Sequence, residues 1–252
     1  MIYVCIPAYN EASTVGVLLW KVRRVLGEFG RDYRLVVLDD ASTDDTAEVL
    51  ARYRRSLPLT ILRSERHQGY GRSVEELLRW VVDHAPYPKR DCAVVMQGDF
   101  TESPEDVVGL VRILEGGADI VAGQVPEEAA RHAPRAVRWA RRLARLALGG
   151  AYRGAPVSDP LSGLRAYRVI VLKKALREVP DDQRLIRSDG WAANLELLRA
   201  LAPHARRIGE APLDIRYHMR ARPSRFHALS TVLSLTRLRG GAWGHGPDVE
   251  AV

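Results

Sequence analysis

Acidic residues stand directly after two apolar runs of the sequence. Asp99 closely follows the run at 92–96, and Asp39 and Asp40 follow the run at 35–38. A short apolar run between polar residues is typical of a strand buried on both faces of a parallel sheet. Ligands bind at the carboxyl edge of such sheets, where Asp99 could hold a divalent cation against a phosphate-bearing substrate. Two adjacent carboxylates at a strand end are energetically costly unless a cation or a hydrogen-bond donor binds them.

The first half of the chain alternates strand-like and helix-like segments. Strands are predicted at 2–6, 35–38, 58–62, 92–96 and 119–122. Helices are predicted at 11–27, at 73–82 and at 104–114, and a further helix follows the acidic turn at 39–45 and ends at residue 50. This alternation predicts an α/β fold with a right-handed, mostly parallel sheet flanked by helices. Asn10 is the expected N-cap of the first helix. The turn at 67–72 lacks the G-x-x-x-x-G-K pattern, which excludes a P-loop kinase.

The second half contains a basic helical segment and further elements. Residues 131–148 are predicted to form one helix, in which arginines and leucines accompany Trp139. This composition fits either a solvated basic face on a packed helix or an interfacial helix at a membrane surface. A short strand after the turn at 159–165, a helix opened by 188–190 and a last strand at 207–217 are also expected.

Composition narrows the classes of protein. The chain of 252 residues carries a net charge of +7, from 38 basic and 31 acidic residues, and its two cysteines lie in apolar runs. The charge favours polyanionic partners such as phosphorylated substrates or an anionic membrane surface; no nucleic-acid-binding motif accompanies it. No apolar run approaches the ~18 residues of a membrane span. Buried, reduced thiols and the lack of an export signal predict a cytoplasmic protein, peripheral at most on the inner face of the membrane.

Six motifs follow one another between residues 2 and 226. They are I-P-A-Y-N-E (6–11), V-L-D-D-A-S-T-D-D-T (37–46), V-M-Q-G-D (95–99), S-D-P-L-S-G-L-R-A-Y (158–167), S-D-G (188–190) with Glu196 and Leu197, and E-A-P (210–212). Together they resemble glycosyltransferase family 2, particularly its polyprenyl (dolichyl) phosphate mannosyl- and glucosyltransferase branch. The resemblance implies a GT-A (Rossmann-like) domain at 1–226, followed by a C-terminal amphipathic helix and flexible tail at 227–252.

The resemblance also implies a nucleotide-diphosphate sugar donor, UDP- or GDP-hexose, and inversion at the anomeric carbon. The expected donor-nucleotide residues lie after the first three strands: Pro7, Tyr9, Glu11, Asp39, Asp40, Gln68 and Gly69. Mg²⁺ or Mn²⁺ would be bound by Asp99, with Gln97 where the family usually has the first acid of D-x-D. An amide oxygen ligates without charge, so weaker metal affinity is expected.

Phosphate binding must depend on arginines elsewhere in the chain. The branch commonly has an arginine after Gly123, and this sequence has Gln124. The candidates for binding the diphosphate are Arg131, Arg220, Arg222 and Arg225. Arg165, together with the basic helix, would contact the acceptor phosphate.

The leading hypothesis is hexose transfer to a lipid phosphate. A phosphomonoester is already mostly a dianion at neutral pH and needs no general base. Asp99 would then act through the metal, and Asp159 would orient Arg165 or occupy the metal's second coordination sphere. A hydroxyl acceptor would instead require a base, for which Asp189 and Asp159 are the candidates. A third hypothesis is a non-catalytic nucleotide-sugar binder, suggested by Gln97. The sequence makes no prediction of oligomeric state.

Overall fold

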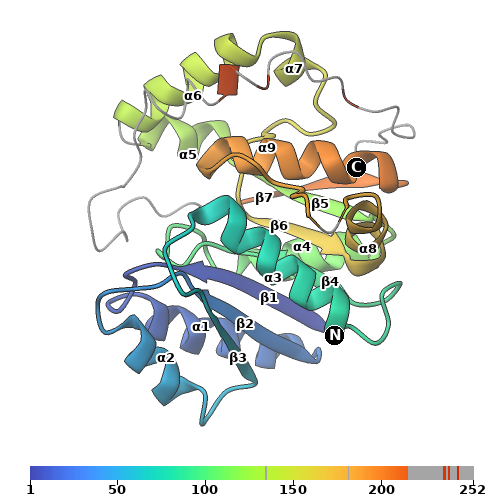
Figure 1. Cartoon of the computed structure of the whole chain (residues 1–252). Helices are drawn as coiled ribbons and strands as arrows, with labels where there is room; N and C mark the ends of the chain where they lie inside the picture. Colours follow the sequence, from blue (N-terminus) through green and yellow to red (C-terminus); the bar gives the residue numbers. More distant parts are fainter. Residues whose placement is uncertain (134, 181, 215–234, 237, 239–242, 244–252) are drawn as a thin grey trace.

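One seven-stranded sheet organises the computed structural model (Figure 1), which describes all residues except 134, 181, 215–234, 237, 239–242 and 244–252. The strand order is β3-β2-β1-β4-β6-β5-β7. The strands are β1 (Ile2–Ala8), β2 (Tyr33–Asp39), β3 (Leu59–Arg63), β4 (Cys92–Val95), β5 (Ile120–Gln124), β6 (Arg165–Arg168) and β7 (Ile208–Pro212). Only β6 runs antiparallel to its neighbours β4 and β5; the other pairings are parallel. The predicted mostly parallel α/β sheet is confirmed.

Alternating residues of the strands feed two cores, one on each face of the sheet. Ile2, Val4 and Ile6 of β1 pack with α1 (Val15–Phe29), α2 (Thr46–Tyr53) and α4 (Asp106–Glu115). Tyr3 and Cys5 pack on the other face with α3 (Tyr70–His84), α8 (Val169–Arg177) and α9 (Gly190–Leu201), the last followed by the 3-10 turn η1 (Ala202–His204). This alternation follows from the two-residue period of a strand, and it places both cysteines in the interior as buried free thiols, as predicted.

A third group of helices lies apart from the sheet, at the top of Figure 1. It consists of α5 (Glu127–His132), α6 (Arg135–Leu148) and the short α7 (Gly150–Arg153). Ala144 and Leu148 of α6 pack against Leu195 of α9 and against Leu235, which joins them in a small separate core. None of the described helices is both long and apolar enough to span a membrane.

Several predicted boundaries were wrong. The first helix begins at Val15 rather than residue 11, and its N-cap residue is Thr14 rather than Asn10. Asn10 instead adopts a left-handed backbone with a φ of 52°, and its side chain accepts the backbone N–H of Thr43. The single helix expected at 131–148 is two helices, α5 and α6. Helix α8 was not predicted, and β7 ends at Pro212 rather than 217. The domain boundary at 226 and the amphipathic helix beyond it fall largely outside the described residues.

Candidate functional site

The carboxyl ends of β1, β2 and β4 meet at one edge of the sheet. The register pairs Ala8 with Asp39, and Cys5 with Val95, so the loops that follow these three strands leave the sheet side by side. Each loop contains a non-glycine residue with positive φ: Asn10 at 52°, Ala41 at 56° and Phe100 at 64°. These are the only such residues in the described part of the chain. Such backbone strain concentrates at functional sites, which makes this edge the candidate site.

Asp39 presents a buried acceptor at this edge. Only 1% of the residue is exposed. Its Oδ1 accepts a hydrogen bond from the backbone N–H of Ser42 at 3.0 Å, while Oδ2 accepts none from the described residues. The Nε atom of exposed Arg63 lies 3.7 Å from Oδ2, too far for a hydrogen bond. A buried carboxylate oxygen without a donor is destabilising, so this atom is prepared to accept a hydrogen bond from a ligand.

Asp40 has a different role from its neighbour. Its two oxygens accept the backbone N–H groups of Gln68 and Gly69, each at 2.9 Å. Oδ2 also lies 2.8 Å from Nδ1 of His67, whose ring stacks on Tyr9 at a centroid distance of 3.9 Å. The carboxylate therefore fixes the turn that precedes α3. Asp40 brings the predicted residues Gln68, Gly69 and Tyr9 to the site edge, but it acts as a positioning residue rather than as an open ligand group.

The β1 loop is held against the β2 loop. The Oδ1 atom of Asn10 accepts the backbone N–H of Thr43 at 2.7 Å. Buried Glu11 accepts the Thr14 hydroxyl at 2.8 Å, and its backbone N–H donates to the Thr46 hydroxyl at 2.8 Å. Pro7, near the end of β1, lies close to the β4 loop, since a Cβ at position 98 would lie 3.2 Å from its carbonyl oxygen. Glycine at 98 is what permits this close approach.

The predicted metal ligands lie on the β4 loop. Asp99 is partly exposed, and its Oδ1 accepts the backbone N–H of Thr101 at 3.0 Å. Gln97 donates its own backbone N–H to Glu102 at 2.8 Å. The described residues contain no cluster of three His, Cys, Asp or Glu side chains that could enclose a metal ion. The protein therefore offers a Mg²⁺ or Mn²⁺ ion only part of a coordination shell. A carboxylate would come from the protein, and substrate phosphates would supply further oxygen ligands.

Glu102 is a buried carboxyl group that sequence reasoning missed. It is 4% exposed and accepts backbone N–H groups from Gln97 and Leu164, which links the metal loop to the segment entering β6. Burial raises the pKa of Glu102 to about 8; the hydrogen bond from Gln97 opposes this shift, and the charge of Asp99 adds to it. The only sequence signal that Glu102 links the metal loop to β6 was its position three residues after Asp99.

Arg165 and Asp159 do not form the predicted pair. Arg165 is fully enclosed, and its guanidinium donates to the carbonyl oxygens of Asn194 at 2.6 Å and Pro160 at 2.5 Å. Asp159 instead binds Nη1 of Arg141 on α6 at 2.7 Å. The expected orientation of Arg165 by Asp159 was therefore wrong, and an arginine enclosed in this way has no exposed surface with which to contact an acceptor phosphate.

Asp189 lies at the amino end of α3. Its exposed carboxylate accepts the backbone N–H of Gly71 at 2.9 Å. A Cβ at position 71 would lie 2.2 Å from the Ser188 carbonyl oxygen, and one at 69 would lie 3.0 Å from Oδ2 of Asp189. The loop before α9 is thus packed tightly on the turn that Asp40 holds, so Asp189 joins the donor-site residues.

The predicted phosphate-binding arginines are not brought together in the described structure. Arg131 on α5 is exposed and lies 3.7 Å from Glu127 of the same helix. Arg220, Arg222 and Arg225 lie outside the described residues. Among the described residues, Arg141 does contact a predicted catalytic residue, Asp159, although it was predicted only as part of the basic helix.

Comparison with known proteins identifies the family. Residues 3–176 match the model of Glycosyl transferase family 2. The chain belongs to this family. Curated relatives include the undecaprenyl-phosphate 4-deoxy-4-formamido-L-arabinose transferases of Edwardsiella ictaluri and Pseudomonas aeruginosa PAO1, at 27% and 28% identity over 176 residues. These alignments cover 69% and 70% of this chain and 50% and 49% of the relatives, so the chain spans about half the length of the curated relatives it matches.

Solved structures share the fold of this family 2 chain. Glucosyl-3-phosphoglycerate synthase from Mycobacterium tuberculosis, in complex with phosphoglyceric acid, aligns with a TM-score of 0.62 at 21% identity, covering 95% of this chain and 77% of the synthase. The S. aureus TarS 1–349 structure in complex with UDP gives a TM-score of 0.53 at 18% identity, covering 82% and 56%. The same synthase has been crystallised with Mn²⁺ and UDP-glucose. The GT-A fold and the family implied by the six motifs are confirmed.

Proposed function

We propose that this family 2 chain transfers a sugar from a nucleotide-diphosphate donor at the carboxyl edge of β1, β2 and β4. The observation that carries the proposal is the buried Oδ2 atom of Asp39, which accepts no hydrogen bond from the described residues, at the same edge as Asp99. A nucleoside supplies the N–H or O–H donor that this oxygen lacks. Asp99 stands where a cation would meet the diphosphate of the same ligand.

The pattern of used and unused oxygens on Asp39 favours a uracil-type base. Oδ1 is already bound to Ser42, which leaves one acceptor. The imide edge of uracil presents a single N–H between two carbonyl oxygens, whereas guanine presents adjacent donors that pair best with both oxygens of a carboxylate. Arg63, 3.7 Å from Oδ2, could donate to a neighbouring carbonyl of the base. UDP in the related TarS and synthase structures supports the same choice.

Divalent metal use is part of the proposal. Asp99 would hold Mg²⁺ or Mn²⁺, with the carboxamide oxygen of Gln97 as a further ligand, and the metal would neutralise charge on the departing diphosphate. The contribution of this chain is to hold Asp99 in place. The bond from Thr101 orients its carboxylate, and Glu102 fixes the loop to β6 through the backbone N–H groups of Gln97 and Leu164.

The proposed acceptor is a polyprenyl phosphate, the class named in the curated relatives. A phosphate dianion attacks without a general base. Consistent with this, Asp159 is bound to Arg141 at 2.7 Å and Asp189 to the N–H of Gly71, so both act as positioning groups. A soluble hydroxyl acceptor is the second candidate. It is favoured by one feature, the exposed carboxylate of Asp189 beside the donor turn, which could serve as its base.

Donor binding is tested by thermal shift with UDP, dTDP and GDP in the presence of Mn²⁺. Ligands that bind the folded state raise its melting temperature, so UDP should raise it more than GDP does. Asp39→Asn should remove this preference, because an amide in place of the carboxylate weakens acceptance from an imide N–H. The exposed Asp83→Asn on α3 is the matched control and should behave as wild type. Equal shifts by UDP and GDP in the wild type would contradict the choice of base.

Acceptor class is tested by transfer of labelled sugar to polyprenyl phosphate and to simple alcohols. Asp99→Asn should abolish transfer to either acceptor, because both reactions release the same diphosphate. Asp189→Asn should reduce transfer to polyprenyl phosphate only by weakening donor binding, which would raise the KM for the nucleotide-sugar donor. A selective loss of kcat with Asp189→Asn would instead indicate that Asp189 acts as a base on a hydroxyl.

A further inference from the structure

Helix α6 presents an apolar ridge to solvent. Seven large hydrophobic side chains are exposed in the described part of the chain, and three of them are on this helix: Trp139 (65% exposed), Leu143 (40%) and Leu146 (68%). Their spacing of four and three residues places them on one helix face. Helix α6 lies at the outer end of the molecule (Figure 1), and the exposure of these three side chains places the ridge on its solvent-facing side.

The ridge is not needed to attach α6 to the protein. The opposite face carries the helix's buried residues, Val137, Ala140, Ala144 and Leu148, all less than 8% exposed. Two of these, Ala144 and Leu148, belong to the small core that includes Leu235. A helix already anchored on one face has no structural reason to carry tryptophan and leucine on the other, so the outer face is a candidate interaction surface.

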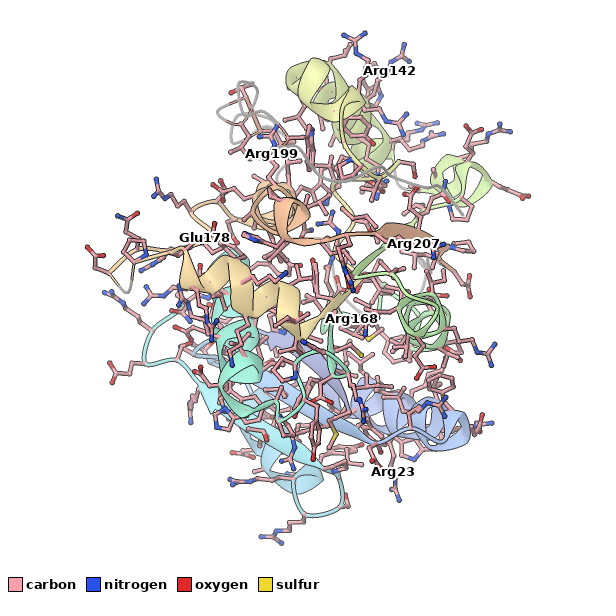
Figure 2. The ribbon with its side chains drawn as sticks, turned by 90° about the vertical axis from the view of Figure 1, so that its right-hand side faces the viewer. Arg23, Arg142, Arg168, Glu178, Arg199 and Arg207 are labelled. Carbon is pink, nitrogen blue, oxygen red and sulfur yellow. The ribbon has the colours of Figure 1, made fainter. Side chains whose placement is uncertain are left out.

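Four arginines run beside the ridge. Arg135, Arg138, Arg142 and Arg145 are all exposed, and none of the 14 residues of α6 is acidic. Figure 2 shows Arg142 pointing outward from the end of the molecule. Residues spaced by three or four positions form a stripe along a helix. The outer face of α6 therefore combines an apolar ridge with a parallel stripe of positive charge.

We propose that this face of α6 lies on an anionic membrane surface. Trp139, Leu143 and Leu146 would enter the boundary between head groups and acyl chains, and the arginines would bind the phosphates of anionic lipids. A convex ridge that contains tryptophan suits a fluid bilayer better than a protein partner, which would need a matching groove. The inference rests on the proposed function in one respect: it names the surface on which the lipid acceptor would be met.

The same helix connects this surface to the candidate site. Arg141 faces inward from α6 and binds Asp159 at 2.7 Å, and Asp159 begins the segment that leads into β6. Docking of α6 would therefore hold the 159–165 segment close to the bilayer. A lipid-borne phosphate would then reach the protein beside Arg141 rather than from bulk solvent.

The test is sedimentation of the full chain with vesicles of neutral phosphatidylcholine, with or without phosphatidylglycerol. The wild type should bind only the anionic vesicles, and less at high salt. Trp139→Ser combined with Leu146→Ser should lower the partition coefficient at least tenfold, as should Arg138→Gln combined with Arg142→Gln. The matched controls lie on α1, at the opposite end of the molecule from Arg142, as the position of Arg23 in Figure 2 shows. They are Trp20→Ser, which also removes an exposed tryptophan, and Arg23→Gln combined with Arg24→Gln; both should bind like wild type.

Two results would overturn the inference. One is wild-type binding that does not distinguish neutral from anionic vesicles, and the other is equal binding by the α6 variants and the wild type. The thermal shift with UDP, measured on the same samples, separates this failure from failure of the proposed function. A normal UDP shift without vesicle binding contradicts only the α6 surface, whereas vesicle binding without a UDP shift contradicts only the donor proposal.

Discussion

Replacing Glu102 with glutamine should change how the stability of the protein depends on pH. The folded protein holds this carboxyl with a pKa of about 8, against an ordinary value of 4.5, because the group is buried. Protons are therefore bound more tightly in the folded state than in the unfolded state. The stabilising contribution of protonated Glu102 is complete below about pH 4.5 and is lost as the pH rises through about 8.

The size of the effect follows from the two pKa values. The difference between 4.5 and about 8 is roughly 3.5 pH units, and each unit corresponds to about 1.4 kcal/mol, so the full contribution is on the order of 5 kcal/mol. Glutamine cannot ionise, and its amide can accept only at one oxygen. Glu102→Gln should therefore lower the free energy of unfolding by a roughly constant 1–3 kcal/mol, because one backbone N–H loses its acceptor. It should also remove the dependence of stability on pH that the ionisation of Glu102 causes.

The assay is urea unfolding of wild type and Glu102→Gln at several values between about pH 5 and pH 8, in chelator so that no cation screens the site. As the pH rises, the wild type should lose stability while the variant does not, so the free energy of unfolding of the variant should increase relative to that of the wild type. Glu105→Gln is the matched control. The Ser103 and Lys21 hydrogen bonds outweigh burial at Glu105 and lower its pKa to about 2, so its titration lies below this window. Parallel curves for wild type and Glu102→Gln across the whole range would refute the assignment of Glu102 as a carboxyl kept neutral by burial.

Two further substitutions test how the donor turn is built. Asp40→Asn should destabilise the protein by about 1–3 kcal/mol in urea unfolding, because an amide cannot accept both the Gln68 and Gly69 N–H groups. The same change should weaken UDP binding. Unchanged UDP affinity would contradict the positioning role of Asp40. Gly71→Ala should lower the melting temperature and UDP affinity together, because its Cβ would lie 2.2 Å from the Ser188 carbonyl oxygen, and wild-type behaviour would show that the loop before α9 does not pack on this turn as described.

Residues at strand ends could be predicted from the sequence because the pattern itself specifies the position. An apolar run that ends in an acid places that acid at the carboxyl edge of a parallel sheet, and Asp39, Asp40 and Asp99 do lie there. The different roles of Asp39 and Asp40 could not be predicted. Adjacent residues at a strand end point in opposite directions, so one meets Ser42 and the other meets the turn before α3, which is distant in sequence.

The burial of individual charged residues could not be predicted from the sequence. Arg165 was predicted to contact the acceptor phosphate in the mechanism that the family resemblance implies, yet the fold encloses it between the carbonyl groups of Pro160 and Asn194. A glutamate just before a helix is typically solvated, so the sequence gives no indication that Glu102 is buried. Whether such a side chain is buried depends on segments far along the chain, here Leu164, and no local pattern records that.

The central claim is that a uridine nucleotide and a divalent cation share the edge formed by β1, β2 and β4. The most direct measurement is a crystal structure with UDP and Mn²⁺, in which anomalous scattering locates the metal. We expect an anomalous peak within coordination distance of the Asp99 carboxylate, and the imide N–H of uracil donating to Oδ2 of Asp39. A metal peak remote from Asp99, with UDP bound elsewhere, would contradict the account.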